Sequence, residues 1–244
     1  MKIIQKGVNI MDITSKKIGL LLIALSTLFM AAVCFGQPRG ELVVCQGAEI
    51  GSLDIAKHIS IPEINYSHQV FDMLYLRDGQ GNPQPRLAVS YKLINDTTWE
   101  FKLRSGIKFH NGAVMTAKDV KFSIDRETDP QTKVFFAFLY ATIKEVKVLD
   151  DLTIQVVTKS PDPLLLKRLS HNIFILPSDL FKEKGAEAFF QHPIGTGPFK
   201  FVSWARNDRM VFEANEGYWD GAPKVKRVIF RPVPEVSTRI AELQ

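Results

Sequence analysis

One short segment, in which apolar and charged residues alternate, constrains the fold of this chain more than any other. Trp99, Phe101 and Leu103 are apolar, and the residues that separate and follow them, from Glu100 to Arg104, are charged. Because successive side chains of a β-strand point to opposite faces, this alternation predicts a half-buried strand with an apolar inner face. Such a strand requires a sheet, and other elements that cover the inner face of that sheet.

Elsewhere the sequence predicts both strands and helices, and therefore an α/β protein. Other expected strands span 41–46, 89–94, 143–149, 153–158, 199–204, 210–214 and 225–231. One helix is expected from Pro62 to about Tyr75, with Ile64, Phe71, Leu74 and Tyr75 near one face. Another is expected after Thr116, because Thr116 and Asp119 resemble an N-cap and its reciprocal acid. Shorter helices are expected up to Leu169 and over 237–244.

Charge and cysteine content exclude several classes of function. The net charge of +5 falls to about +2 without residues 1–36, which hold four Lys and one Asp, and no basic stripe suited to nucleic acid remains. Beyond residue 36 the only cysteine is Cys45, expected to be buried in its strand, so neither an intrachain disulfide nor a cysteine zinc site is available. The five histidines show no metal-ligand spacing, and no nucleophile elbow is present. We therefore expect no enzyme, no metal and no cofactor.

The N-terminus has the pattern of a secretory signal. A basic pair at 16–17 precedes an apolar run, Ile18–Phe35, which small residues follow. This order predicts export to the periplasm, with cleavage before Gln37. The run is also long enough to cross a bilayer, so an uncleaved membrane anchor is the alternative. Translation from Met11 instead of Met1 would give a more compact signal.

Two pairs of segments carry a resemblance to a known family. The first pair is Trp99–Gly112 followed by Thr116–Arg126, and the second is Pro193–Phe201 followed by Asn215–Trp219. In order, spacing and residues they resemble the peptide-, oligopeptide- and nickel-binding class of extracellular solute-binding proteins of ABC importers. The resemblance extends from about Glu41 to the last residue.

The resemblance implies a fold and a division into lobes. It implies a type II periplasmic-binding-protein-like α/β fold with a small inserted α+β domain. Residues 1–36 would be the signal peptide. The main lobe would comprise 37–77 and 170–235, and the inserted domain 78–169. Residues 236–244 would begin another lobe, which continues in the resembled proteins and which we expect to be missing from this chain.

Two loops are the candidate ligand walls. The loop after the first strand contributes Glu49, Ile50 and Ser52, because α/β folds commonly bind ligands at strand ends and because this loop borders the cleft in the resembled family. Its Asp54 is expected to be a turn or capping residue. The second loop is Gly195, Thr196 and Gly197, which has neither dinucleotide-fingerprint nor P-loop spacing. These residues either form a tight turn that lets backbone approach backbone, or line the cleft; the two interpretations are compatible.

The resemblance implies the substrate-binding component of an ABC importer. Its partners would be a peptide or another small solute and the membrane permease subunits, and no nucleic acid. The sequence does not name the solute, because much of the specificity in the resembled family resides in the other lobe. Two alternatives remain: a truncated, non-transporting fragment or interaction module, and a secreted hydrolase.

Overall fold

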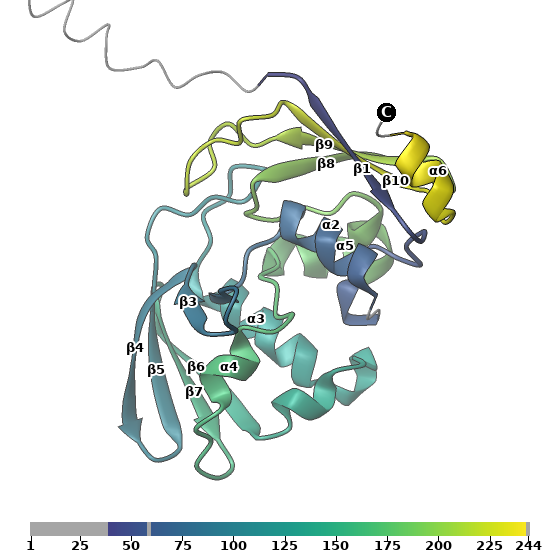
Figure 1. Ribbon diagram of the computed structural model, residues 1–244. Coiled ribbons are helices and arrows are strands. Elements are labelled where there is room, and N and C mark those ends of the chain that lie inside the picture. Colours follow the sequence, from purple (N-terminus) through teal and green to yellow (C-terminus); the bar gives the residue numbers. More distant parts are fainter. Residues whose placement is uncertain (1–38, 58–59, 243–244) are drawn as a thin grey trace, which may run out of the picture. The chain divides into compact units, whose positions relative to one another are not determined.

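The alternating segment forms the central part of a four-stranded antiparallel sheet. In the computed structural model, which describes residues 39–57 and 60–242, β5 (Thr98–Leu103) pairs with β4 (Ala88–Asn95) and β7 (Thr153–Thr158), and β6 (Ile143–Asp150) completes the order β4-β5-β7-β6 (Figure 1). Trp99, Phe101 and Leu103 are 9%, 0% and 4% exposed, so the predicted inner face is confirmed. The predicted signal, residues 1–36, lies outside the described residues.

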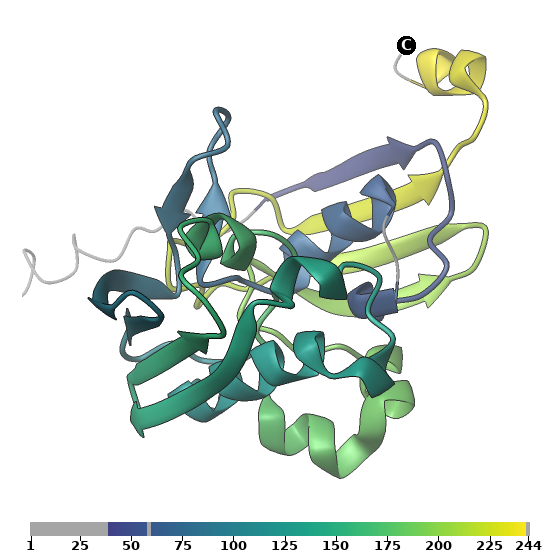
Figure 2. The ribbon, with the colours of Figure 1, turned by 90° about the horizontal axis from the view of Figure 1, so that it is seen from below.

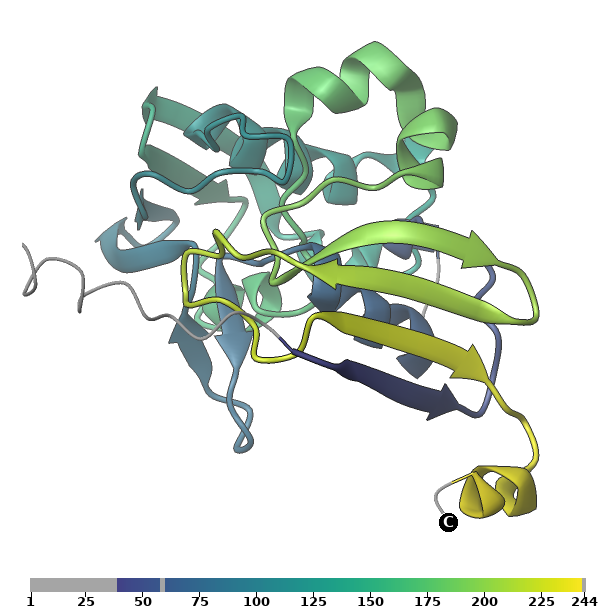
Figure 3. The same ribbon diagram turned by 90° about the horizontal axis from the view of Figure 1, so that it is seen from above.

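A second four-stranded sheet joins the start and the end of the described chain. Its members are β1 (Glu41–Gln46), β8 (Phe199–Ala205), β9 (Arg209–Ala214) and β10 (Arg227–Pro232). β1 pairs in parallel with β10, from Glu41 opposite Arg227 to Gln46 opposite Pro232, and the other neighbours are antiparallel, which gives the order β1-β10-β9-β8. Figure 3 shows these four strands face on, with β1 at the open edge.

Helices and short turns connect and cover the sheets. They are η1 (Ile55–Lys57), α2 (Ile61–Val70), α3 (Ala117–Thr128), η2 (Pro130–Thr132), η3 (Ala137–Tyr140), α4 (Leu165–Leu169), α5 (Ser178–Gln191) and α6 (Val236–Ala241). A small hairpin pairs β2 (Tyr75–Arg77) with β3 (Pro83–Pro85). Figure 2 shows α6 beyond the end of β10, away from the sheet. Among residues 39–57 and 60–242 no helix is both long and apolar enough to cross a membrane.

The predicted cap of α3 is confirmed and extends to a second helix. The Oγ of Thr116 accepts from the amide of Lys118 (3.3 Å), and the carboxylate of Asp119 accepts from the amide of Thr116 (2.8 Å). The other oxygen of the Asp119 carboxylate accepts from the amide and hydroxyl of Ser178, both at 2.8 Å, at the start of α5. One acid therefore fixes the N-termini of both α3 and α5.

Each sheet has its own apolar core. The core of the β4–β7 sheet includes Phe101, Ile124, Ile154 and Val156, all fully buried. The core beneath β1 and β8–β10 contains Tyr66, Phe189 and Phe212, also fully buried, among other aromatic residues. Tyr66 of α2 and Phe189 of α5 thus anchor their helices in this aromatic core.

The helix expected up to Tyr75 is shorter than predicted. α2 ends at Val70, and Phe71 is extended (φ −123°, ψ 147°). Hydrogen bonds to distant segments hold the following residues straight: the carbonyl of Asp72 accepts from Ile175, and that of Leu74 accepts from Ala88. The helix face proposed from the sequence is therefore wrong, and the buried side chains of α2 are those of Glu63, Tyr66, Ser67 and Val70.

Three further features differ from the sequence prediction. The 14-residue helix α5 was not predicted, because Gly185 interrupts it with a positive φ of 74° and divides its apolar pattern. Cys45 is half-buried and not fully buried, because β1 is an edge strand, and its thiol donates to Glu242 (3.3 Å). The last helix is α6, Val236–Ala241, one residue earlier at its start than expected and ending before residue 244.

Candidate functional site

A cavity of about 790 Å³ lies beside the loop that follows β1. One wall is the loop itself with η1, another is the C-terminal half of α5, and the third is β8 and the turn after it. The residues that line it are Gly51, Ser52, Leu53, Asp54, Lys57, Ala186, Glu187, Phe190, Gln191, His192, Phe201, Val202, Ser203, Trp204 and Arg206. Its volume is in the range of small-molecule sites.

Apolar and polar contacts hold the loop against α2. Ile50 and Leu53 are 5% and 3% exposed, so the two residues anchor the loop to the core. The carboxylate of Glu63 accepts from the amides of Gly51 (3.3 Å) and Ser60 (2.9 Å), and the hydroxyl of Tyr66 donates to the carbonyl of Leu53. The loop therefore presents a defined backbone to the cavity.

Asp54 is a structural residue of this loop. Its carboxylate accepts from the amide of Ala56 (3.2 Å) and from Nη2 of Arg126, at 2.9 and 2.7 Å for its two oxygens. Its own amide donates to the hydroxyl of Ser52 (2.9 Å). This is the turn role expected from the sequence, and the partner Arg126 neutralises the acid.

The rim of the cavity carries charges of both signs: Asp54 and Glu187 are acidic, and Lys57 and Arg206 are basic. The indole Nε1 of Trp204 donates to Glu49 (2.8 Å), and the guanidinium of Arg206 lies 4.3 Å from the centroid of the Trp204 ring. Nζ of Lys57 lies 3.8 Å from the carboxylate of Asp54. A solute that carries both a cationic and an anionic group matches this rim electrostatically.

A segment with three exposed or half-exposed phenylalanines lies next to the same loop. The amide of Phe135 donates to the carbonyl of Ala56 (3.3 Å). Phe135 and Phe138 are 56% and 67% exposed, and the ring of Phe136 lies between them, 5.1 and 6.2 Å from their centroids. None of these three phenylalanines lines the cavity.

The predicted residues of the first loop lie near this cavity, but they border two different hollows. Ser52 lines the cavity. Glu49 and Ile50 border a smaller hollow, of about 20 Å³, on the other side of Trp204. Of the three predicted residues, only Ser52 therefore lines the cavity.

The predicted second wall, Gly195–Gly197, lies elsewhere, packed against the end of α2. All three residues are buried and none lines the cavity. A Cβ on Gly195 would lie 2.0 Å from the carbonyl oxygen of Val70, and one on Gly197 would lie 2.5 Å from the carbonyl carbon of Val70. The amide of Gly197 donates to that carbonyl oxygen at 2.9 Å. The glycines thus make the close backbone approach that their lack of a side chain permits.

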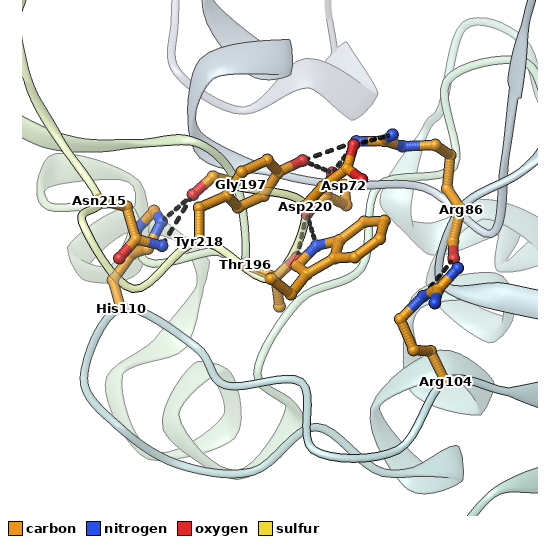
Figure 4. A network of polar contacts seen from close by, with 10 residues as sticks. Asp72, Arg86, Arg104, His110, Thr196, Gly197, Asn215, Tyr218 and Asp220 are labelled. Atoms are coloured by element: carbon orange, nitrogen blue, oxygen red, sulfur yellow. Dashed lines mark hydrogen bonds and ion pairs between the residues drawn. The ribbon is translucent and has the colours of Figure 1, made fainter. Parts of the chain in front are cut away.

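Thr196 belongs to a buried polar network centred on Asp72. The carboxylate of Asp72 accepts from the hydroxyls of Thr196 (3.0 Å) and Tyr218 (2.8 Å) and from Nε1 of Trp219 (2.9 Å) (Figure 4). Burial raises the pKa of Asp72, and these three hydrogen bonds and nearby Arg86 oppose the rise. The network joins the end of α2 to both loops of the second motif pair.

Two arginines complete the network from the other sheet. Nη1 of Arg86 lies 2.5 Å from the carboxylate of Asp220, and the guanidinium groups of Arg86 and Arg104 each lie 4.7 Å from the Trp219 ring centroid. The Tyr218–Trp219 pair therefore connects the two sheets, which is a structural role.

The comparisons with known proteins agree with the sequence resemblance. The model of the middle region of family 5 of the bacterial extracellular solute-binding proteins matches residues 82–244. The chain belongs to this family. Both motif pairs identified in the sequence lie within the matched region, so the family match covers the network around Asn215, Tyr218 and Trp219 as well as β5.

Relatives in family 5 include named glutathione-binding proteins. The glutathione-binding protein GsiB of Pectobacterium atrosepticum is 37% identical over 162 residues, which cover 65% of this chain and 31% of that protein. GsiB of Escherichia coli O1:K1 is 30% identical over 228 residues, which cover 93% of this chain and 44% of that protein. The chain therefore spans less than half the length of these relatives.

Solved structures of the family share this mixed α/β fold. The oligopeptide-binding protein AppA of Bacillus subtilis, in complex with a nonapeptide, aligns with a TM-score of 0.78 and 26% identity, over 85% of this chain and 43% of that one. NikZ of Campylobacter jejuni, in complex with Ni(L-His), aligns with a TM-score of 0.76 and 29% identity, over 85% and 42%. In the part of the chain that the structure describes, no group of three His, Cys, Asp or Glu residues is placed to hold a metal ion.

Sequence reasoning missed most of the cavity. It did not single out Trp204, Lys57, Arg126 or any residue of α5. Trp204 and Glu49 are 155 residues apart, and Arg126 and Asp54 are 72 apart, so no local pattern connects them. The available signal was the loop after β1, which follows a strand end and of which Ser52 lines the cavity.

Proposed function

We propose that this chain forms one wall of the solute-binding site in the substrate-binding component of an ABC importer. The observation that carries the proposal is the cavity of about 790 Å³ between the loop after β1, α5 and β8, in a chain of family 5. Its wall is a loop fixed by Glu63, Tyr66 and Arg126. A fixed backbone and an aromatic side chain, Trp204, are features of preformed ligand sites.

The proposal keeps the division into lobes expected from the sequence. Residues 37–77 and 170–235 would form the main lobe, which is supported by the sheet that β1 shares with β8–β10. Residues 78–169 would form the inserted domain, which is supported by the separate sheet β4–β7. The permease partners, and export through the signal at 1–36, are part of the same proposal.

The proposed solute is a peptide or a similar small molecule. The named relatives bind glutathione, and the solved structures hold a nonapeptide or a nickel–histidine complex. The rim of this cavity offers two cations, Lys57 and Arg206, and two acids, Asp54 and Glu187. Glutathione and short peptides carry both a free amino group and free carboxylates, so they are the first solutes to test. In this proposal Ser52, Trp204 and the backbone of Glu49–Ser52 contact the solute, and Gly195–Gly197 support α2 from behind.

The affinity of this polypeptide for its solute should be low. A binding site normally removes most of the ligand surface from water. The chain spans 44% of the GsiB relative that it matches over most of its own length. The proposed wall contacts the solute from one side, so a dissociation constant of about 1 mM is expected, which corresponds to about −4 kcal/mol.

Titration calorimetry with glutathione and a pool of di- and tripeptides tests the proposal. Trp204→Ala should abolish the heat of binding, because it removes both the aromatic wall and the partner of Glu49. Tyr91→Ala is the matched control, because Tyr91 is a half-exposed aromatic residue on β4 (46%) that does not line the cavity. Equal heats from both variants, or no heat from the unmodified chain at millimolar solute, would contradict the proposal.

A further inference from the structure

The guanidinium of Arg126 is buried between the loop after β1 and α5. Arg126 lies near the end of α3, and its side chain is 8% exposed. Its Nη2 donates to both carboxylate oxygens of Asp54, at 2.9 and 2.7 Å, and its Nη1 lies 3.8 Å from Glu127 Oε1. The Asp54 side chain is 5% exposed. Both side chains are mostly shielded from water, with Asp54 at the edge of the cavity and Arg126 at the edge of a second cavity of about 630 Å³. The ion pair is therefore screened less than a surface pair.

The same guanidinium also contacts α5, the second wall of the cavity. It lies 5.2 Å from the ring centroid of Phe181 and 5.4 Å from that of Phe190. Phe190 lines the cavity. A cation over an aromatic face is attracted by the negative charge density of the ring, most strongly where water is excluded. One charged group thus contacts two walls of the cavity at once.

Asp54 transmits its position to the residues around it. Its Oδ1 accepts from the amide of Ala56 (3.2 Å), and its carbonyl accepts from the amide of Lys57 (3.1 Å). Its amide donates to the hydroxyl of Ser52 (2.9 Å). Ser52 and Lys57 both line the cavity. If the carboxylate of Asp54 moved, the backbone from Ser52 to Lys57 would move with it.

We propose that Arg126 is the positioning residue of this site: it fixes the loop Gly51–Lys57 and the C-terminal half of α5 relative to each other, without contacting the solute. α3, which carries Arg126, packs on the β4–β7 sheet, so that sheet contributes to the geometry of a cavity built from the other one. This inference rests on the proposed function only in taking the cavity as the solute site.

Removing Arg126 should loosen the two walls selectively. A buried ion pair that loses one partner leaves an uncompensated charge, which draws in water or leaves the interior. Asp54 has an exit towards the cavity, because its residue already lines it. Ile50 and Leu53 remain anchored in the core, so opening should concentrate between Asp54 and Lys57. The packed glycine loop at 193–199 does not contact the Arg126–Asp54 pair, so its backbone should not open when Arg126 is removed.

Hydrogen–deuterium exchange of the unliganded chain tests the inference. In Arg126→Gln, peptides covering 50–57 and 186–192 should exchange about tenfold faster, while peptides covering 70–77 and 193–199 keep their rates. Lys121→Gln is the matched control: Lys121 lies on the same helix and pairs with Asp125 at 2.6 Å, but both side chains are about half exposed (42% and 46%). Lys121→Gln should leave the exchange rates of all these peptides unchanged.

Two further variants keep the test decisive if Arg126→Gln does not fold. Arg126→Lys keeps the charge but loses the planar group that contacts two oxygens and two rings, so its exchange should be intermediate. Asp54→Asn keeps the shape of the side chain. It should accelerate exchange in the peptides covering 50–57 more than in those covering 186–192. Unchanged exchange in these variants, or equal acceleration of all peptides, would overturn the positioning role.

Because this readout uses no solute, it separates the two proposals. Selective exchange in the variants, together with no solute binding by the unmodified chain, would overturn the proposed function and leave the positioning role of Arg126 standing. Solute binding by the unmodified chain, together with uniform exchange in the variants, would overturn the positioning role alone.

Discussion

The imidazole of His110 donates a hydrogen bond of 3.0 Å from Nε2 to the carbonyl of Gly197, although 87 residues separate them. The amide of Gly195 donates to Nδ1 of the same ring (3.4 Å). These partners require the neutral tautomer with its proton on Nε2. The two motif pairs on which the family resemblance rested are therefore in direct contact through a side chain that must remain uncharged.

Acid should destabilise the protein partly through His110. Burial lowers the pKa of His110 from 6.5 to about 4. Between these values the unfolded chain binds the proton and the folded chain does not, so the free energy of unfolding falls as pH decreases from about 6.5 to 4, by at most about 1.4 kcal/mol per pH unit. Urea melts across this range should show a smaller fall in His110→Gln. If the free energy of unfolding fell equally with pH in both proteins, His110 would not be the group responsible.

Base should destabilise the protein through Glu127. Burial raises the pKa of Glu127 to about 8, with Arg126 opposing and Asp54 adding to the rise. The folded state therefore keeps a proton that the unfolded state releases above about pH 4.5, and the free energy of unfolding decreases as pH rises towards 8.

Glu127→Gln should remove this dependence, because the amide resembles the protonated acid in shape and charge. The variant should be as stable as the unmodified chain near pH 5 and more stable at pH 8, as measured by denaturant melts at both values. Asp125→Asn, whose side chain is 46% exposed, is the control on the same helix and should show no such crossover. A variant less stable at pH 8 would show that Glu127 is ionised in the folded protein.

Gly197→Ala should prevent normal packing of the loop on α2. The new Cβ would lie 2.5 Å from the carbonyl carbon of Val70, which is backbone and cannot rotate away. Overpacking typically costs about 1–3 kcal/mol, and a clash with backbone is expected at the upper end of that range. Gly217→Ala is the control, because its Cβ would meet nothing closer than 3.8 Å. Thermal melts of both variants measure the difference, and equal melting temperatures would refute the close approach.

Phe101→Ala should destabilise the β4–β7 sheet by about 3–5 kcal/mol, because the ring is fully buried at 0% exposure. Lys102→Ala, at the next position on the opposite face, should cost about 1 kcal/mol or less, mainly from the lost hydrogen bond of 2.8 Å to Thr153. Denaturant melts of the two variants compare the faces. Similar losses would mean that the two faces of β5 are equally buried.

The sequence predicted the elements whose signal is local. Alternation over Trp99–Leu103 and the cap at Thr116 depend only on neighbouring residues, and both predictions were correct. The end of α2 was wrong because hydrogen bonds from Ile175 and Ala88, both distant in the chain, straighten the backbone after Val70. α5 was missed because Gly185 divides its pattern.

The site was predicted less completely than the fold, for the same physical reason. The loop after β1 was identified by its place at a strand end. Its essential contacts, Trp204 with Glu49 and Arg126 with Asp54, form only when distant segments pack together. Gly195–Gly197 has the same glycine pattern whether a ligand or another backbone approaches it, and in this chain the carbonyl of Val70 occupies that place.

The most direct test of the account is a solute titration that observes the three tryptophan indole N–H groups by NMR, with Trp204→Phe used for assignment. Trp204 lines the cavity, whereas Trp99 and Trp219 lie in the core and in the Asp72 network. With glutathione or a short-peptide pool, we predict a saturable shift of the Trp204 signal with a midpoint of about 1 mM and no shift of the other two. A Trp204 signal that does not move, or a shift confined to Trp99 or Trp219, would contradict the proposed solute site.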